Sequence, residues 1–208
     1  MIEVKICGMM RAEDIEASRL ADYNGFVMAS ESRRSLSPER ALELMSICTT
    51  RKVLVTTATS VPELERLAAR LDPDVLQVHS TMDEKELQRL ARSISAPIWA
   101  LVPIGGGDEL ARGRQMARCS HAAVLDTCAK VLGGTGTTHD WEVSRRVRDE
   151  LHPFPVVLAG GLDPHNVAEG VAMVRPAVVD VSSGVETNAS KDPFLITEFI
   201  ENARRTSE

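Results

Sequence analysis

The sequence lacks long apolar segments, blocks of like charge, low-complexity stretches and linkers. No apolar run approaches the ~20 residues that a helix needs to cross a bilayer. Lys5 and Arg11 interrupt the apolar residues at the N-terminus, so a signal peptide is not expected either. The formal charge of −6 comes from interspersed acids and bases, which argues against a nucleic-acid or membrane surface. Any anionic ligand therefore needs a local binding site.

The cysteines have neither the close pairing of a disulfide framework nor the spacing of a metal site. They are Cys7, Cys48, Cys119 and Cys128. Free thiols are typical of the reducing cytosol. We therefore expect a cytoplasmic protein without a metal site, whose ligands are small molecules.

Short apolar runs that favour strands alternate with segments of helical periodicity along the whole chain. The predicted strands are residues 2–6, 25–28, 52–57, 74–78, 98–102, 122–125, 156–159 and 178–181. The predicted helices are residues 12–22, 38–48, 61–71, 82–94, 108–118, 141–151, 164–173 and 193–205. Eight units averaging about 26 residues favour a closed barrel over an open doubly wound sheet. We therefore predict an α/β protein with a single (β/α)8 TIM barrel over residues 1–208.

The last two predicted strands end in residues that can hold an anion. Gly160-Gly161 follows strand 156–159, and Ser182-Ser183-Gly184 follows strand 178–181. Glycine permits close backbone approach, and exposed amides together with a helix starting at Asp163-Pro164 attract phosphate. The position matches the recurrent phosphate site of TIM barrels. We predict that Gly160, Gly161, Ser182, Ser183 and Gly184 bind a phosphorylated small molecule.

Cys7 and Asp126 each follow or end a predicted strand, so both belong at the mouth of such a barrel. A thiolate at Cys7 can act as a nucleophile or a base, whereas the alternative is a small buried apolar side chain. Asp126 directly follows the apolar run 122–125. Asp126 is either a functional acid or a structural residue that caps a helix or braces a loop.

Four further features have both functional and structural interpretations. Arg34 can pair with a substrate carboxylate or remain a solvated charge. Gln77 and His79 alternate with apolar residues, so they can form an interior hydrogen-bonded pair or take part in catalysis. Lys5 can be an interior ion-pair partner or a reactive amine. The glycine-rich segment 133–136 is either a lid or a long connection.

Several short motifs together resemble the phosphoribosylanthranilate isomerase family. They are Lys5-Ile6-Cys7-Gly8, Gln77-Val78-His79, Leu125-Asp126-Thr127, Gly133-Gly134-Thr135-Gly136, Leu158-Ala159-Gly160-Gly161-Leu162 and Asp180-Val181-Ser182-Ser183-Gly184-Val185-Glu186. Their order and their places after the predicted strands extend the resemblance over almost the whole chain. The resemblance implies a (β/α)8 barrel of the tryptophan pathway that needs neither metal nor organic cofactor.

The activity implied by the resemblance is an Amadori rearrangement. It converts N-(5-phosphoribosyl)anthranilate into 1-(2-carboxyphenylamino)-1-deoxyribulose 5-phosphate. By similarity, Asp126 protonates the furanose ring oxygen as general acid and Cys7 removes the C2 proton as general base. Arg34 matches the position that holds the anthranilate carboxylate, and the loops at 160–162 and 182–184 hold phosphate.

The chain departs from the family pattern near the barrel mouth. Ser80 stands where glycine is common after the Gln-Val-His motif, and Thr56 stands where an aromatic residue commonly ends the third strand. Because Cys7, Arg34 and Asp126 are all present, we interpret these changes as altered packing. Two alternatives remain: an isomerase for a related aminoaldose phosphate and a non-catalytic phosphosugar-binding barrel. Either a monomer or a homodimer is compatible with the sequence.

Overall fold

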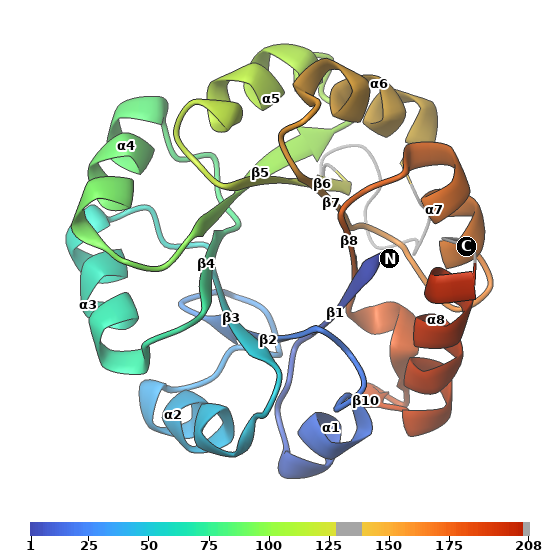
Figure 1. Cartoon of the computed structure of the whole chain (residues 1–208). Helices are drawn as coiled ribbons and strands as arrows, with labels where there is room; N and C mark the ends of the chain where they lie inside the picture. Colours follow the sequence, from blue (N-terminus) through green and yellow to red (C-terminus); the bar gives the residue numbers. More distant parts are fainter. Residues whose placement is uncertain (128–138, 206–208) are drawn as a thin grey trace.

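The computed structural model describes residues 1–127 and 139–205. Its parallel strands pair in the closed order β1-β2-β3-β4-β5-β6-β7-β8, and Figure 1 shows the helices as a ring around this barrel. Pairing of β1 with β8, from Glu3 opposite Val178 to Ile6 opposite Val181, closes the barrel. The predicted (β/α)8 barrel is therefore confirmed.

The elements alternate as the sequence predicts. The barrel strands are β1 (Glu3–Cys7), β2 (Tyr23–Met28), β3 (Arg51–Thr56), β4 (Val75–Val78), β5 (Ile98–Ile104), β6 (Ala122–Thr127), β7 (Val156–Leu158) and β8 (Val178–Val181). The helices are α1 (Ala12–Ala17), α2 (Pro38–Ile47), α3 (Val61–Leu71), α4 (Glu84–Ser93), α5 (Glu109–Ala117), α6 (Trp141–Leu151), α7 (Val167–Val174) and α8 (Pro193–Arg205). A short 3₁₀ helix, η1 (Ser183–Val185), and the hairpin β9 (Glu186–Thr187) and β10 (Ser190–Lys191) lie between β8 and α8, and neither was predicted.

Helix starts follow local capping chemistry. The Ser37 side chain accepts a hydrogen bond from the Arg40 amide at the start of α2, and the Asp140 side chain accepts one from the Glu142 amide at the start of α6. Ser60 occupies the cap position of α3 without a side-chain hydrogen bond, so proline near the first turn contributes more there.

Two predicted helices have different bounds in the structure. α1 ends at Ala17 rather than residue 22, because the Ser18 hydroxyl bonds back to the Asp14 carbonyl and the chain then turns. α7 begins at Val167, not at Pro164. Asp163 accepts hydrogen bonds from the amides of His165 and Asn166, which forms a turn in place of the first helical turn.

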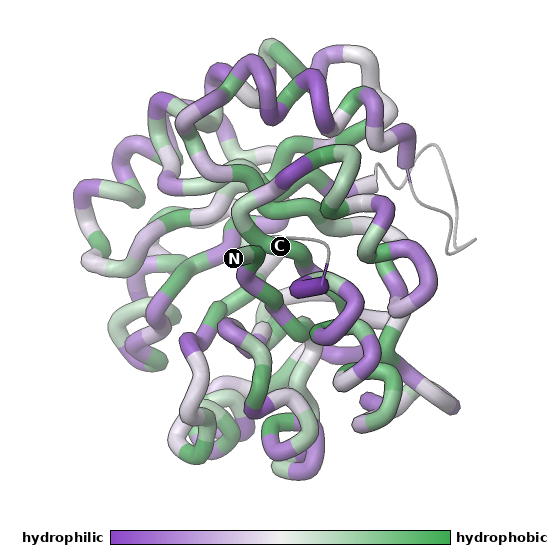
Figure 2. Tube along the Cα trace, turned by 45° about the vertical axis from the view of Figure 1, so that its right-hand side comes forward, coloured by the Kyte–Doolittle hydropathy of each residue, from purple (hydrophilic) through white to green (hydrophobic). Residues whose placement is uncertain are grey.

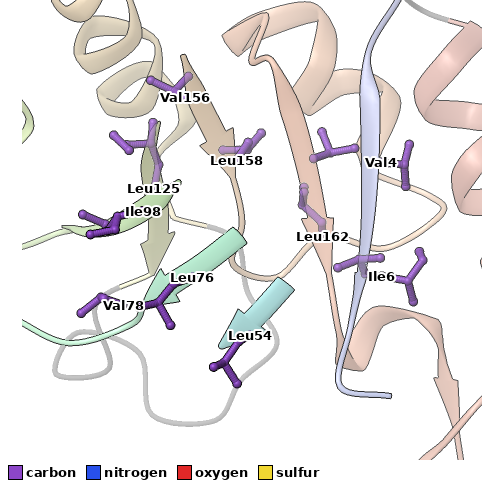
Figure 3. Close-up of a cluster of buried hydrophobic side chains, with 14 of the residues drawn as sticks. Val4, Ile6, Leu54, Leu76, Val78, Ile98, Leu125, Val156, Leu158 and Leu162 are labelled. Carbon is purple, nitrogen blue, oxygen red and sulfur yellow. The ribbon is translucent and has the colours of Figure 1, made fainter. Parts of the chain in front are cut away.

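Alternation along the strands separates two apolar layers. One face of each strand packs outward against the helices, and Figure 3 shows part of this layer, including Val4, Ile6, Leu54 and Leu125. The other face fills the barrel interior, where Tyr23 and Trp99 meet edge to face with ring centroids 5.0 Å apart. Lys5, Cys7 and Asp180 share this inward face by strand alternation.

The helices are amphipathic, and Figure 2 shows hydrophilic and hydrophobic residues alternating along them. Among the described residues, no helix is long and apolar enough to cross a membrane.

Candidate active site

A cavity of about 340 Å³ opens at the carboxyl ends of the strands. Most of the predicted site residues line it, namely Cys7, Arg34, Asp126, Gly160, Gly161, Ser182 and Ser183. They come from β1, β6 and the loops after β2, β7 and β8. This is the face on which TIM barrels assemble their sites.

Cys7 lies at the end of β1 and is 8% exposed. Its thiol packs against Gly25, where an added Cβ would lie 2.8 Å from Sγ, and the Ser182 hydroxyl donates to the Cys7 carbonyl at 3.1 Å. Burial raises the pKa of the Cys7 thiol, while the nearby Lys5 ammonium opposes that rise. The thiol is free in the structure and lies on the cavity wall.

Lys5 forms an ion pair inside the barrel, which is one of the two roles the sequence allowed. Its Nζ donates to Oδ2 of Asp180 at 2.7 Å, and Lys5 is fully buried. Burial lowers the pKa of Lys5, but the Asp180 and Cys7 side chains outweigh this and leave it raised. The other Asp180 oxygen has no hydrogen-bond partner among the described residues, and Asp180 lines the cavity.

Asp126 belongs to β6 and contacts two polar groups. Its Oδ1 accepts a hydrogen bond from the Thr127 amide at 2.7 Å, and its Oδ2 lies 3.4 Å from Nε2 of His79. Gln77 in turn contacts Nδ1 of His79 at 3.2 Å, so the hydrogen-bonded pair that was one of the two possibilities for these residues is present. Burial raises the pKa of Asp126, and His79 opposes the rise. A carboxyl with a raised pKa can hold a proton closer to neutral pH.

A buried histidine braces the end of β6. Nδ1 of His139 contacts the Thr127 hydroxyl at 3.2 Å, and Nε2 contacts the Ser144 hydroxyl at 2.6 Å. Burial lowers the pKa of His139 to about 4. The imidazole therefore stays neutral in the folded protein at pH values where it would be protonated in the unfolded chain.

This histidine should make the protein less stable in mild acid. Below pH 6.5 the unfolded chain binds a proton at His139, whereas the folded protein binds this proton only when the pH falls to about 4. Between pH 7.5 and 4.5 this group should lower the free energy of unfolding by about 2–3 kcal/mol. Urea unfolding of wild type and His139→Gln at both pH values measures the effect, and an equal pH-dependent loss in the two proteins would contradict it.

Arg34 lies on the cavity wall and is already paired with a carboxylate of the same chain. Its Nε donates to Oε1 of Glu186 at 2.8 Å, and its Nη2 donates to Oε2 at 2.8 Å. The arginine is therefore not a freely solvated charge. Glu186 lies in β9 and ends the family motif 180–186, but no role was predicted for it.

The two loops predicted to bind phosphate line the same cavity. Gly160 and Gly161 have φ values of +82° and +70°, and a Cβ on Gly160 would lie 2.4 Å from the Thr127 hydroxyl. Only glycine adopts this backbone without strain. Ser182 and Ser183 line the same cavity. The start of α7 at Val167 places the helix N-terminus farther along the chain than predicted from Asp163-Pro164.

Gly184 is the one predicted site residue that does not line the cavity. An added Cβ would lie 1.9 Å from the Leu162 carbonyl oxygen, so the absence of a side chain lets the loops after β7 and β8 touch. The structure thus offers a packing reason for this glycine. Its predicted role in binding substrate remains a prediction.

Gly184→Ala should destabilise the protein by about 1–3 kcal/mol, because a methyl group meets backbone atoms that cannot rotate away. Gly106→Ala is the matched control, since its Cβ would meet only the flexible Asp108 side chain at 3.3 Å. Thermal and urea unfolding compare the two variants. Equal stability of both would show that the loops after β7 and β8 separate at little cost.

Three polar residues of the site were not predicted as functional. Asp180 had a signal, because it alternates with valines inside a core strand. Glu186 ends the family motif 180–186 but follows no strand directly, and Lys191 has no signal, because their hairpin comes after the strand and its pairing is tertiary. Segment 133–136, the predicted lid, lies outside the described residues. Among the residues described, no cluster of three or more His, Cys, Asp or Glu side chains could hold a metal ion.

Together these features define a (β/α)8 barrel with a thiol, a carboxyl and two loops rich in glycine and serine around one cavity. A family model described as N-(5'phosphoribosyl)anthranilate (PRA) isomerase matches residues 4–202. The chain belongs to this family.

Individual relatives cover nearly the same length. N-(5'-phosphoribosyl)anthranilate isomerase of Methanothrix thermoacetophila is 40% identical, over 98% of this chain and 99% of its own. A crystal structure of monomers generated from the dimeric phosphoribosylanthranilate isomerase of Thermotoga maritima superimposes with a TM-score of 0.87. The two sequences are 31% identical, and the match covers 99% of this chain and 100% of that chain. Another isomerase, solved in complex with reduced 1-(o-carboxyphenylamino)-1-deoxyribulose 5-phosphate, has a TM-score of 0.84 and 30% identity, over 99% of this chain and 100% of that chain.

Proposed function

We propose that this chain is an aldose-ketose isomerase of tryptophan biosynthesis. It converts N-(5-phosphoribosyl)anthranilate into 1-(2-carboxyphenylamino)-1-deoxyribulose 5-phosphate. The observation that carries the proposal is that Cys7 and Asp126, from β1 and β6, line one cavity together with the glycine and serine loops after β7 and β8. Membership of the isomerase family over nearly the whole chain supports it.

Asp126 acts first, as general acid. It donates a proton to the furanose ring oxygen, the bond between that oxygen and C1 breaks, and a cationic Schiff base forms between C1 and the anthranilate nitrogen. The positive charge makes the C2 proton more acidic, so a modest base is enough to remove it. The raised pKa of Asp126 favours the protonated form that this step needs.

Cys7 acts second, as general base. Its thiolate removes the C2 proton, which gives an enolamine. In the ketonisation the C2 hydroxyl gives a proton to the Asp126 carboxylate and Cys7 returns its proton to C1, so the acid and the base are both restored. C2 is oxidised from an alcohol to a ketone while C1 is reduced, so electrons move only within the substrate. The Lys5 ammonium lowers the pKa of the Cys7 thiol and so offsets part of the rise that burial causes.

The ends of the substrate are held away from the reacting carbons. Arg34 binds the anthranilate carboxylate, and Gly160, Gly161, Ser182 and Ser183 bind the phosphate. Binding energy from these remote groups orients C1 and C2 between the acid and the base. Gly184 shapes the phosphate loop through its contact with Leu162.

A single assay tests the proposal. Consumption of N-(5-phosphoribosyl)anthranilate is followed by loss of its fluorescence with purified protein, and the aminoaldose phosphate of the histidine pathway is offered in parallel. Turnover of the first compound supports the proposal, and turnover of the second compound alone would assign the related isomerase. Binding of phosphosugar without turnover of either would favour a non-catalytic barrel.

A further inference from the structure

Three cations converge on the carboxylate of Glu186, whose side chain is 6% exposed. Arg34 pairs with both oxygens at 2.8 Å, and Nζ of Lys191 donates to Oε1 at 2.9 Å. Arg33 also donates to Oε2. Burial opposes ionisation of Glu186, but the hydrogen bonds and charges of Arg34 and Lys191 lower its pKa to about 2. The carboxylate is thus charged at neutral pH.

Glu186 determines which edge of Arg34 is open. A guanidinium is a planar fork that can meet carboxylates along two edges. Glu186 occupies the Nε and Nη2 edge, whereas Nη1 has no hydrogen-bond partner among the described residues and Arg34 lines the cavity. The stem of Arg34 crosses Gly8 so closely that a Cβ there would lie 2.4 Å from Cδ. Gly8 therefore restrains the aliphatic part of the Arg34 side chain, and Glu186 restrains its guanidinium.

Lys191 links the Glu186 carboxylate to the loop after β8. Lys191, whose side chain is 2% exposed, donates from Nζ to the Ser182 carbonyl at 2.8 Å as well as to Glu186. Three cations against one carboxylate leave this cluster with a net positive charge, so a second carboxylate is still attracted to Arg34. The hairpin β9–β10 therefore contacts both Arg34, through Glu186, and the loop at Ser182, through Lys191.

We propose that Glu186 is a positioning residue that makes the site selective for phosphosugars bearing a carboxylate. It holds the Nη1 edge of Arg34 toward the cavity, so that the carboxylate of the substrate meets a guanidinium that is already oriented. A preoriented arginine loses little side-chain freedom on binding, and preorganisation raises affinity mainly by reducing that loss. This inference rests on the proposed function, because the carboxylate is that of the anthranilate ring.

Two ligands that differ only in the carboxyl group measure the effect of Glu186 on carboxylate binding. One is reduced 1-(o-carboxyphenylamino)-1-deoxyribulose 5-phosphate, and the other is the same compound made from aniline, which lacks the carboxyl group. Calorimetry gives the ratio of their Kd values for each protein. A charge-assisted hydrogen bond should make wild type prefer the carboxylated ligand by about 10- to 100-fold. In Glu186→Gln the preference should fall to about 1- to 3-fold, while binding of the aniline compound stays near the wild-type value.

Two further variants sharpen the test. Arg34→Gln should lose the preference by itself, and adding Glu186→Gln to it should cause little further loss, because both act through one guanidinium. Glu150→Gln is the matched control, since it removes an exposed pair with Arg114 at 2.8 Å on the far helices and should leave the ratio unchanged. If Glu186→Gln fails to fold because Lys191 is left buried without its partner, Glu186→Gln with Lys191→Met removes both charges and must also lose the preference.

The outcomes separate this inference from the proposed function. A wild-type ratio near one, or a full preference retained in Glu186→Gln, would overturn the role of Glu186 whether or not the protein turns over substrate. Wild type that prefers the carboxylated ligand but does not isomerise N-(5-phosphoribosyl)anthranilate would overturn the proposed reaction and leave the role of Glu186 to be judged by the ratio alone.

Discussion

Replacing Cys7 by serine should lower kcat for N-(5-phosphoribosyl)anthranilate by about 10²- to 10⁴-fold, the usual contribution of a positioned general base. Serine fits the space beside Gly25, but its hydroxyl ionises far less readily than a thiol, so it does not remove the C2 proton. The Lys5 ammonium that favours a thiolate at this position has no thiol to act on in the variant. KM should change little, because the carboxylate and phosphate contacts remain.

Cys48→Ser is the matched control for this change. Cys48 is a free, half-buried cysteine whose sulfur contacts Thr50 and the Asn24 amide, away from the cavity. Its kcat should stay within about twofold of wild type, since a hydroxyl can make the same contacts. Initial rates of fluorescence loss compare the proteins. Undiminished turnover by Cys7→Ser would remove Cys7 from the mechanism.

Asp126→Asn should cause a loss of similar size, about 10²- to 10⁴-fold in kcat. The amide oxygen can still accept from the Thr127 amide, so the end of β6 should keep its shape. What is lost is the proton that opens the furanose ring. Asp83→Asn serves as control, because asparagine caps α4 as well as aspartate does and lies outside the cavity. Retained turnover in Asp126→Asn would assign Asp126 to bracing the loop alone.

The residual activities of the two variants should respond to pH with opposite signs. Without Asp126, activity depends on Cys7 being ionised and should rise as pH increases. Without Cys7, activity depends on Asp126 being protonated and should fall as pH rises through a pKa that burial places above 3.8. Slopes of the same sign in kcat against pH would show that the acid and base assignments are wrong.

The strands were predicted closely because the barrel buries both faces of each one. In the run Val178 to Val181, for example, every residue except Asp180 is a valine, and this signal does not depend on which strands lie beside it. The helix ends were predicted less well. At Asp163-Pro164 the sequence has an ordinary helix start, but the Asp163 side chain bonds to the amides of His165 and Asn166 and delays the helix to Val167. Competing local hydrogen bonds of this kind have no periodic signal.

The candidate site was predictable where a residue type follows directly on a strand. Cys7, Asp126 and the glycines at 160 and 161 have this signal, because the ends of parallel strands meet at one mouth. Glu186 has no such signal. Its importance depends on Arg34, which is 152 positions earlier in the chain, and that contact exists only when β2 and β8 close around the same cavity.

The sequence by itself therefore determined the barrel, through eight alternations of strand and helix pattern, and the residue types at its mouth. These are local properties, set by side-chain period and by the residue that follows each strand. Only the tertiary structure decided which charges pair. Lys5 meets Asp180 inside the barrel, and Arg34 is held by Glu186, because barrel closure joins segments that are distant in the chain. Pairing energies depend on separation in space and on burial, and neither quantity is contained in the order of the residues.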